Sequence, residues 1–119
     1  IVTLRRLQQP GLWDGIAATT ARIEETIASA AHEAGVTVTQ TRVGTMFCTY
    51  FAEAPITDWA SVKRSDTERF VVYFRALLEG GVYLPPSQFE SCFVSSAHGE
   101  AEIETTYRAA AAAFKEVAG

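Results

Sequence analysis

The residues best suited to chemistry lie in one short stretch, Gly80–Glu90, with the sequence GGVYLPPSQFE. It ends in a hydroxyl, an amide and a carboxylate, on Ser87, Gln88 and Glu90. The two glycines permit positive φ values that other residues resist. The two adjacent prolines fix φ and remove two backbone donors, which excludes a central strand. The stretch is therefore either a rigid connector from a helix to a strand, or a rigid loop that holds these three side chains against a ligand.

Other candidate groups have simpler interpretations. His98 could be a catalytic base, but its neighbours offer no nucleophile, and a loop histidine before a helix is usually structural. His32 has no cysteine or second histidine at ligand spacing, so we predict no metal site. Lys63-Arg64 and Arg42 could bind an anion, but charges before a helix or at a strand end are usually just solvated. No catalytic residue emerges from these groups.

Composition excludes several classes of protein. The 119 residues suffice for one domain, and 48% hydrophobic with 20% charged residues is ordinary for a folded chain. A net charge of −4 gives no basic footprint for nucleic acid, and no apolar run is long enough to span a membrane. Cys48 and Cys92 lie in apolar surroundings, so we interpret them as reduced core thiols of a cytoplasmic or plastid-stroma protein.

The pattern of apolar residues predicts an α+β fold, a small, mostly antiparallel sheet covered by helices. Helices are expected over 1–9, 12–34, 65–79 and 100–117, with a short helical turn at Trp59–Val62. Strands are expected over 36–41, 46–52 and 92–95, the first two pairing antiparallel through a turn at 42–45. Ser65 and Glu68 predict a capping box at the start of the third long helix.

Several stretches together carry a family resemblance. The run GGVYLPPSQFE, followed by Phe93–His98 (FVSSAH), closely resembles the C-terminal part of the glutamate-1-semialdehyde 2,1-aminomutases, pyridoxal-phosphate enzymes of the class III aminotransferase family. Arg42–Phe47 and Ala60–Phe70 look like the same family. The resemblance covers essentially all 119 residues but only the last part of the family's chain.

The resemblance implies that residues 1–119 form the C-terminal small domain of a fold-type I pyridoxal-phosphate enzyme. Residues 1–9 would be the end of a long interdomain helix, and the large cofactor-binding domain would lie outside this sequence. The first residues agree, because a helical pattern that starts without an N-cap or an initiator Met indicates a cut helix. Apolar side chains should then be exposed near residues 1–9 and around Tyr83–Phe89, where the rest of the enzyme would pack.

The family converts glutamate 1-semialdehyde to 5-aminolevulinate for tetrapyrrole synthesis, using the pyridoxal and pyridoxamine forms of its cofactor. The Schiff-base lysine and the aspartate that pairs with the pyridine nitrogen lie upstream in the family. The resemblance therefore implies no catalytic or cofactor-binding residue here, no bound cofactor and no activity for the isolated segment. It implies instead that Glu90, with Ser87 and Gln88, lines the substrate pocket, because a carboxylate can bind the ammonium groups of the substrate or hold an arginine.

The implied partners are the enzyme's own N-terminal and large domains, a second subunit of a homodimer and a small-molecule substrate, but no nucleic acid or membrane. Two alternatives remain. An ordinary class III aminotransferase is disfavoured by the run Ser87–Glu90, which looks specific to the aminomutases. A free-standing ligand-binding or interaction module is disfavoured by the apparent cut in the first helix.

Overall fold

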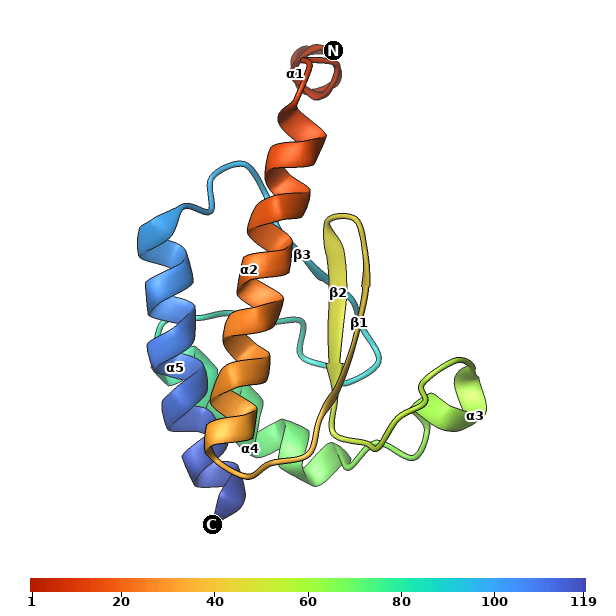
Figure 1. The fold of residues 1–119 in the computed structure, drawn as a ribbon, viewed down its shortest axis with the longest axis vertical. Helices are drawn as coiled ribbons and strands as arrows, with labels where there is room; N and C mark the ends of the chain where they lie inside the picture. Colours follow the sequence, from red (N-terminus) through yellow and green to blue (C-terminus); the bar gives the residue numbers. More distant parts are fainter.

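The computed structural model describes all residues, Ile1–Gly119, and places three long helices on one side of a small sheet (Figure 1). The elements in chain order are α1 (Val2–Leu7), α2 (Leu12–Glu33), β1 (Thr39–Val43), β2 (Met46–Tyr50), α3 (Trp59–Val62), α4 (Thr67–Glu79), β3 (Cys92–Phe93) and α5 (Glu100–Ala118). The sheet order is β1-β2-β3, and both pairings are antiparallel. The predicted α+β class is confirmed.

Helical spacing predicts a buried stripe in α2 of Leu12, Ile16, Thr20, Ile23, Ile27, Ala30 and Ala34, with Gly35 as the stop. The helix follows most of this stripe, although Leu12 and Ala34 are only half-buried. Its buried residues Ile16, Thr20, Ile23, Ile27 and Ala30 recur every three to four positions, and Ala31 is buried beside them. Gly35 has a φ of 68°, the left-handed conformation that closes a Schellman motif. In this motif the backbone N–H of Val36 donates to the carbonyl of Ala31 at 2.9 Å, and that of Gly35 to His32 at 3.0 Å.

This helix ending corrects the predicted start of the first strand. Strand β1 begins at Thr39 and not at Val36, because the Val36 N–H is already bonded to the end of α2. At its other end the strand runs into the predicted turn, and Val43 pairs with Met46. Only two residues remain for the hairpin loop, and Gly44, with a φ of 60°, provides the positive φ that such loops need.

The cap of α4 is also corrected. Asp66, and not Ser65, is the N-cap, and its carboxylate accepts hydrogen bonds from the backbone N–H groups of Glu68 at 3.1 Å and Arg69 at 3.0 Å. Ser65 is buried, and its hydroxyl has no hydrogen-bond partner. Aspartate and serine are comparable N-caps in isolation, so the burial of Ser65 decides between them.

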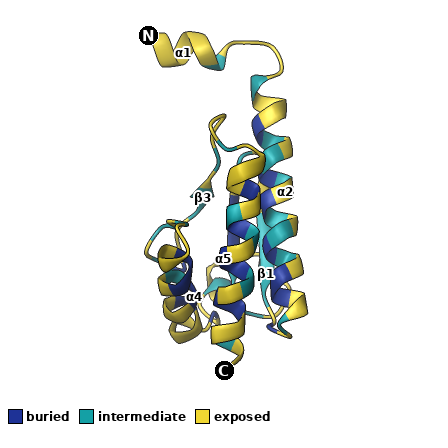
Figure 2. Cartoon of the chain, turned by 90° about the vertical axis from the view of Figure 1, so that its left-hand side faces the viewer, coloured by how far each residue is buried: buried dark blue, intermediate teal, exposed yellow.

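Helix α5 packs between α2 and α4 and completes the core (Figure 2). Its contact with α4 is close, because a Cβ added at Gly80 would lie 2.7 Å from the Cβ of Ala109. The core cluster consists of Ile23, Ile27, Ala30, Ala31, Val36, Phe47, Phe51, Phe70, Tyr73, Ala76, Leu77, Ile103, Ala109, Ala110, Ala113 and Phe114. The spacing of apolar residues in α4 predicts a buried stripe of Phe70, Phe74, Leu77 and Leu78. The prediction was wrong at Leu78, which is 48% exposed, and it omitted Tyr73, which is 1% exposed.

Helix α1 lies outside this core, and strand β3 is shorter than predicted. Helix α1 has no buried residue and projects from the end of α2 (Figure 2). Strand β3 has two residues where four were predicted, although the backbone N–H of Val94 still reaches the carbonyl of Thr45 at 3.2 Å. None of the helices is both long and apolar enough to cross a bilayer.

Candidate functional site

The loop from Gly80 to Ser91 is held at its start by the end of α4. A second Schellman motif forms there: Gly81 has a φ of 86°, and the Val82 N–H donates to the carbonyl of Leu77 at 2.8 Å. Val82 and Leu84 then pack against the core cluster. The loop therefore enters the site from a fixed point, as both interpretations of this stretch required.

The far end of the loop is a tight turn stabilised by Ser87. The Ser87 hydroxyl accepts a hydrogen bond from the backbone N–H of Phe89, and its carbonyl accepts one from the N–H of Glu90, both at 3.2 Å. A serine hydroxyl that bonds the backbone two residues ahead is a common way of fixing a turn. Ser87 thus shapes the backbone that carries Glu90.

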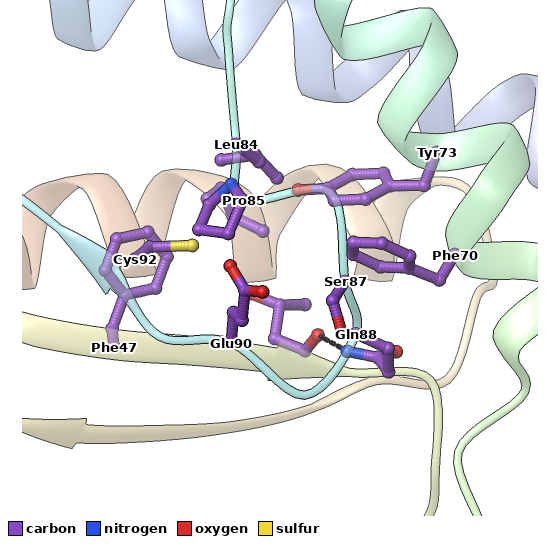
Figure 3. Close-up of a pocket in the computed structure, with 11 residues that line it drawn as sticks. Phe47, Phe70, Tyr73, Leu84, Pro85, Ser87, Gln88, Glu90 and Cys92 are labelled. Carbon is purple, nitrogen blue, oxygen red and sulfur yellow. Dashed lines mark hydrogen bonds between the residues drawn. The ribbon is translucent and has the colours of Figure 1, made fainter.

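Gln88 points inward. It is 4% exposed; its amide nitrogen donates to the carbonyl of Thr49 at 2.8 Å, and its amide oxygen accepts from the N–H of Phe51 at 3.2 Å. Figure 3 shows this side chain turned onto the strand, away from the carboxylate of Glu90. Its burial argues against the predicted direct contact between Gln88 and a ligand.

Glu90 is exposed, and no protein group hydrogen-bonds to its carboxylate. It lies at the rim of a small cavity, with the carboxylate directed toward Pro85 (Figure 3). The cavity is lined by Ile27, Phe47, Thr49, Phe70, Tyr73, Leu84, Pro85, Ser87, Gln88, Glu90 and Cys92. The carboxylate is therefore available to a cationic group approaching from outside the domain.

The other titratable groups of this cavity stay neutral at physiological pH. Burial, with a smaller contribution from Cys48, raises the pKa of the Cys92 thiol to about 12. Burial also raises the pKa of Tyr73, whose hydroxyl has no hydrogen-bond partner. Both cysteines are free thiols, and the Cys48 sulfur lies 3.5 Å from the Glu90 carbonyl and 3.5 Å from the Ser91 hydroxyl. Glu90 is thus the charged member of the site.

The remaining sequence candidates lie elsewhere. Arg42 pairs with Glu24, with 2.7 Å between Nε and Oε2. Nδ1 of His98 accepts a hydrogen bond from the backbone N–H of Ser95 at 3.1 Å, which holds the bend before α5. Three or more His, Cys, Asp or Glu residues that could hold a metal do not gather anywhere in the structure.

The residues of this chain do not fit a pyridoxal-phosphate site by themselves. Such a site needs a lysine amine and an acid against the pyridine nitrogen in one cavity. Lys63 and Lys115 are exposed, and neither lines any of the five main cavities. A cofactor would have to be held by groups outside these 119 residues.

Exposed apolar side chains are found at the two expected places, and also elsewhere, for example at Trp59 and Val71. Near the first helix they include Ile1, Val2, Leu4 and Trp13, and on the loop they include Tyr83 and Phe89. Sequence reasoning missed that Phe93, 69% exposed, joins the first group. It lines a groove of about 550 Å³ together with Val2, Leu7, Leu12 and Trp13, between α1, α2 and the segment after β3. No pattern in the sequence marked this residue, because the two-residue length of β3 is known only from the structure.

The chain is similar in sequence to known enzymes over nearly its whole length. No protein-family model matches the chain. Glutamate-1-semialdehyde 2,1-aminomutase from Citrifermentans bemidjiense is 45% identical over 115 residues, which is 97% of this chain and 27% of that enzyme. The enzyme of the same name from Laribacter hongkongensis is 48% identical over 117 residues, 98% of this chain and 28% of that enzyme. The chain thus spans about a quarter of the length of these relatives.

Solved structures agree on the fold. An omega-transaminase from Sphaerobacter thermophilus matches 96% of this chain with a TM-score of 0.77 and 25% identity, over 26% of its own length. A transaminase with PLP bound matches 94% of the chain with a TM-score of 0.76 and 23% identity, over 25% of its length. Over 97–98% of its length the chain is similar in sequence to the C-terminal part of the glutamate-1-semialdehyde 2,1-aminomutases, and its fold matches part of two transaminases.

Proposed function

We propose that this chain is the C-terminal domain of an aminomutase that converts glutamate 1-semialdehyde to 5-aminolevulinate, the precursor of tetrapyrroles. The single observation that carries the proposal is the 45–48% identity with two enzymes of that name over 97–98% of the chain. A match of 115–117 of the 119 residues includes the turn that presents Glu90, the one charged group at the candidate site.

Within such an enzyme, the domain would form one wall of the substrate site. The Glu90 carboxylate has no protein partner and stands on a turn fixed by Ser87. It can accept charge-assisted hydrogen bonds from a substrate ammonium group, or from an arginine of another domain that itself binds the substrate. Pyridoxal phosphate, held by the rest of the polypeptide, would supply the electron sink for amino-group transfer.

An ordinary class III aminotransferase is the second candidate, and the structural match to an omega-transaminase favours it. We prefer the aminomutase because identity is 45–48% with aminomutases and 25% with that transaminase. A free-standing ligand-binding module is the third candidate. The exposed apolar side chains on two sides of the domain argue for a covering partner instead.

We further propose that the enzyme is a homodimer, that the domain packs on its own N-terminal and large domains, and that it works in the cytoplasm, or in the plastid stroma of a plant or alga. In this arrangement the groove beside Phe93 and Trp13 would be covered by the remainder of the polypeptide.

The test uses the full-length polypeptide in which this sequence lies. Purified with pyridoxamine phosphate, it should form 5-aminolevulinate from glutamate 1-semialdehyde without any second amino donor or acceptor. The 119-residue chain alone should neither form a borohydride-trappable lysine adduct with pyridoxal phosphate nor turn over. Activity of the full-length protein only with separate donor and acceptor substrates would favour the ordinary aminotransferase. Turnover by the 119-residue chain alone would refute the domain assignment.

A further inference from the structure

The Gln88 side chain bridges two backbone groups of one strand edge. It donates to the carbonyl of Thr49 at 2.8 Å and accepts from the N–H of Phe51 at 3.2 Å. A neighbouring strand engages the same pair of groups, two residues apart, when it continues a sheet. Strand β3 cannot engage them, because its pairing with β2 covers only Met46 and Phe47. The Gln88 amide therefore completes the edge of β2 beyond the end of β3.

This bridge joins parts of the chain that are 37 and 39 residues apart, and it is buried. Buried backbone groups need hydrogen-bond partners, so loss of the amide would leave two of them unsatisfied. The Cys48 thiol adds a weaker contact, at 3.5 Å, to the carbonyl of Glu90. The turn is thus anchored to β2 mainly through one side chain.

The position of the Glu90 carboxylate depends on this anchor. No protein group holds the carboxylate itself, and its backbone N–H is bonded within the turn, to Ser87. The turn is closed by its own hydrogen bonds, and the Gln88 side chain bonds it to the edge of β2.

We propose that Gln88 is a positioning residue, whose buried amide fixes the Ser87–Glu90 turn on the open edge of β2 and so holds the Glu90 carboxylate where the substrate binds. The proposal rests on the function proposed above. It replaces direct substrate binding by Gln88 with an indirect role that acts through Glu90.

The experiment is a double-mutant cycle in the full-length enzyme. Gln88→Met keeps the approximate size of the side chain and removes its hydrogen bonds to the Thr49 carbonyl and the Phe51 N–H. In the wild-type background it should lower kcat/KM for glutamate 1-semialdehyde about tenfold. In the Glu90→Gln background it should lower kcat/KM by less than about a further twofold, because the effects of residues that act as a unit are non-additive. Gln40→Met is the matched control. Gln40 also donates to Thr49, to its hydroxyl at 3.2 Å, but it lies on β1 and not on the loop. It should leave kcat/KM unchanged.

Hydrogen–deuterium exchange separates this proposal from the proposed function. In Gln88→Met, peptides covering residues 48–52 and 86–91 should exchange at least about tenfold faster, while α5 stays protected. If Gln88→Met fails to fold, Gln88→Asn keeps the amide chemistry with a shorter reach and should give smaller changes of the same kind. The positioning role would be overturned if Gln88→Met lowered kcat/KM equally in the wild-type and Glu90→Gln enzymes. Unchanged hydrogen–deuterium exchange in Gln88→Met would also overturn it. Absence of aminomutase activity in the wild-type enzyme would overturn the proposed function instead, with the exchange result still deciding whether Gln88 anchors the turn.

Discussion

At the scale of single residues, Glu90 and Gln88 are polar side chains of one turn that have different roles. Both belong to one turn, but Glu90 is exposed and has no partner, whereas Gln88 is buried and has two. A buried amide with both ends bonded contributes to the fold, whereas an exposed, unpaired carboxylate contributes little to stability. Glu90 is therefore the residue of the two that is available to bind a ligand.

Replacing Glu90 by glutamine tests whether its carboxylate contacts the substrate. Glu90→Gln keeps the shape and removes the charge, so turnover of glutamate 1-semialdehyde by the full-length enzyme should fall about tenfold or more. That factor corresponds to the loss of one charge-assisted contact of about 1.5–3 kcal/mol. Steady-state kinetics measures the effect, and absorbance of the bound cofactor checks that cofactor binding survives. Glu116→Gln, at an exposed position near the end of α5, is the control and should change nothing. Wild-type kinetics in Glu90→Gln would reduce the loop to a connector.

At the scale of elements, the sequence predicted what depends on local pattern. The stripe of α2, its stop at Gly35, the stop of α4 at Gly80-Gly81 and the antiparallel pairing of β1 with β2 all follow from periodicity and glycine. The errors lie where a backbone group is already used or a residue is buried by distant parts of the chain. The start of β1, set by the bond between Val36 and Ala31, is one example.

The candidate site was predictable only in part, for the same reason. Residue types marked Ser87, Gln88 and Glu90 as one polar group on a stiff loop. The inward direction of Gln88 depends on the edge of β2, which β3 leaves open after Phe47, 37 or more residues away from it in sequence. The local sequence around Gln88 does not predict which distant strand edge its side chain will contact.

The crossing of α4 and α5 leads to a prediction with an internal control. Gly80→Ala should lower the free energy of unfolding by about 1–3 kcal/mol, because the new methyl group would lie 2.7 Å from the Cβ of Ala109 and the helices would have to separate. Gly15→Ala, in α2, places its methyl group in open space and should raise that free energy by about 0.5–1 kcal/mol. Urea unfolding followed by circular dichroism measures both. A Gly80→Ala protein as stable as the wild type would mean that the helices are not in close contact.

At the scale of the whole molecule, the exposed apolar side chains determine how the domain behaves in isolation. Trp13 and Phe93 are 51% and 69% exposed and line the same groove. Removing such surface from water is favourable, so two copies of the chain should bury it against each other when no other domain does so.

The 119-residue chain should therefore self-associate with rising concentration. Trp13→Ser with Phe93→Ser should weaken that association about tenfold or more, the loss of burial of two aromatic side chains. Sedimentation velocity over a range of concentrations measures it. Val71→Ser, at a 45% exposed position of α4 outside the groove, should leave association unchanged. A monomer at all concentrations would mean that the groove does not drive contact between copies.

The close approach of the helices also limits how this domain can evolve. Six core positions are already alanine, namely Ala30, Ala31, Ala76, Ala109, Ala110 and Ala113, and all are at most 7% exposed. A leucine or isoleucine in a core can mutate to several smaller residues, but alanine can shrink only to glycine, and every other exchange adds volume. Almost every substitution at these positions therefore increases the volume of the side chain. The divergence of this domain should be concentrated at its larger core residues and on its surface, while the helix crossings keep the same small residues from one relative to the next.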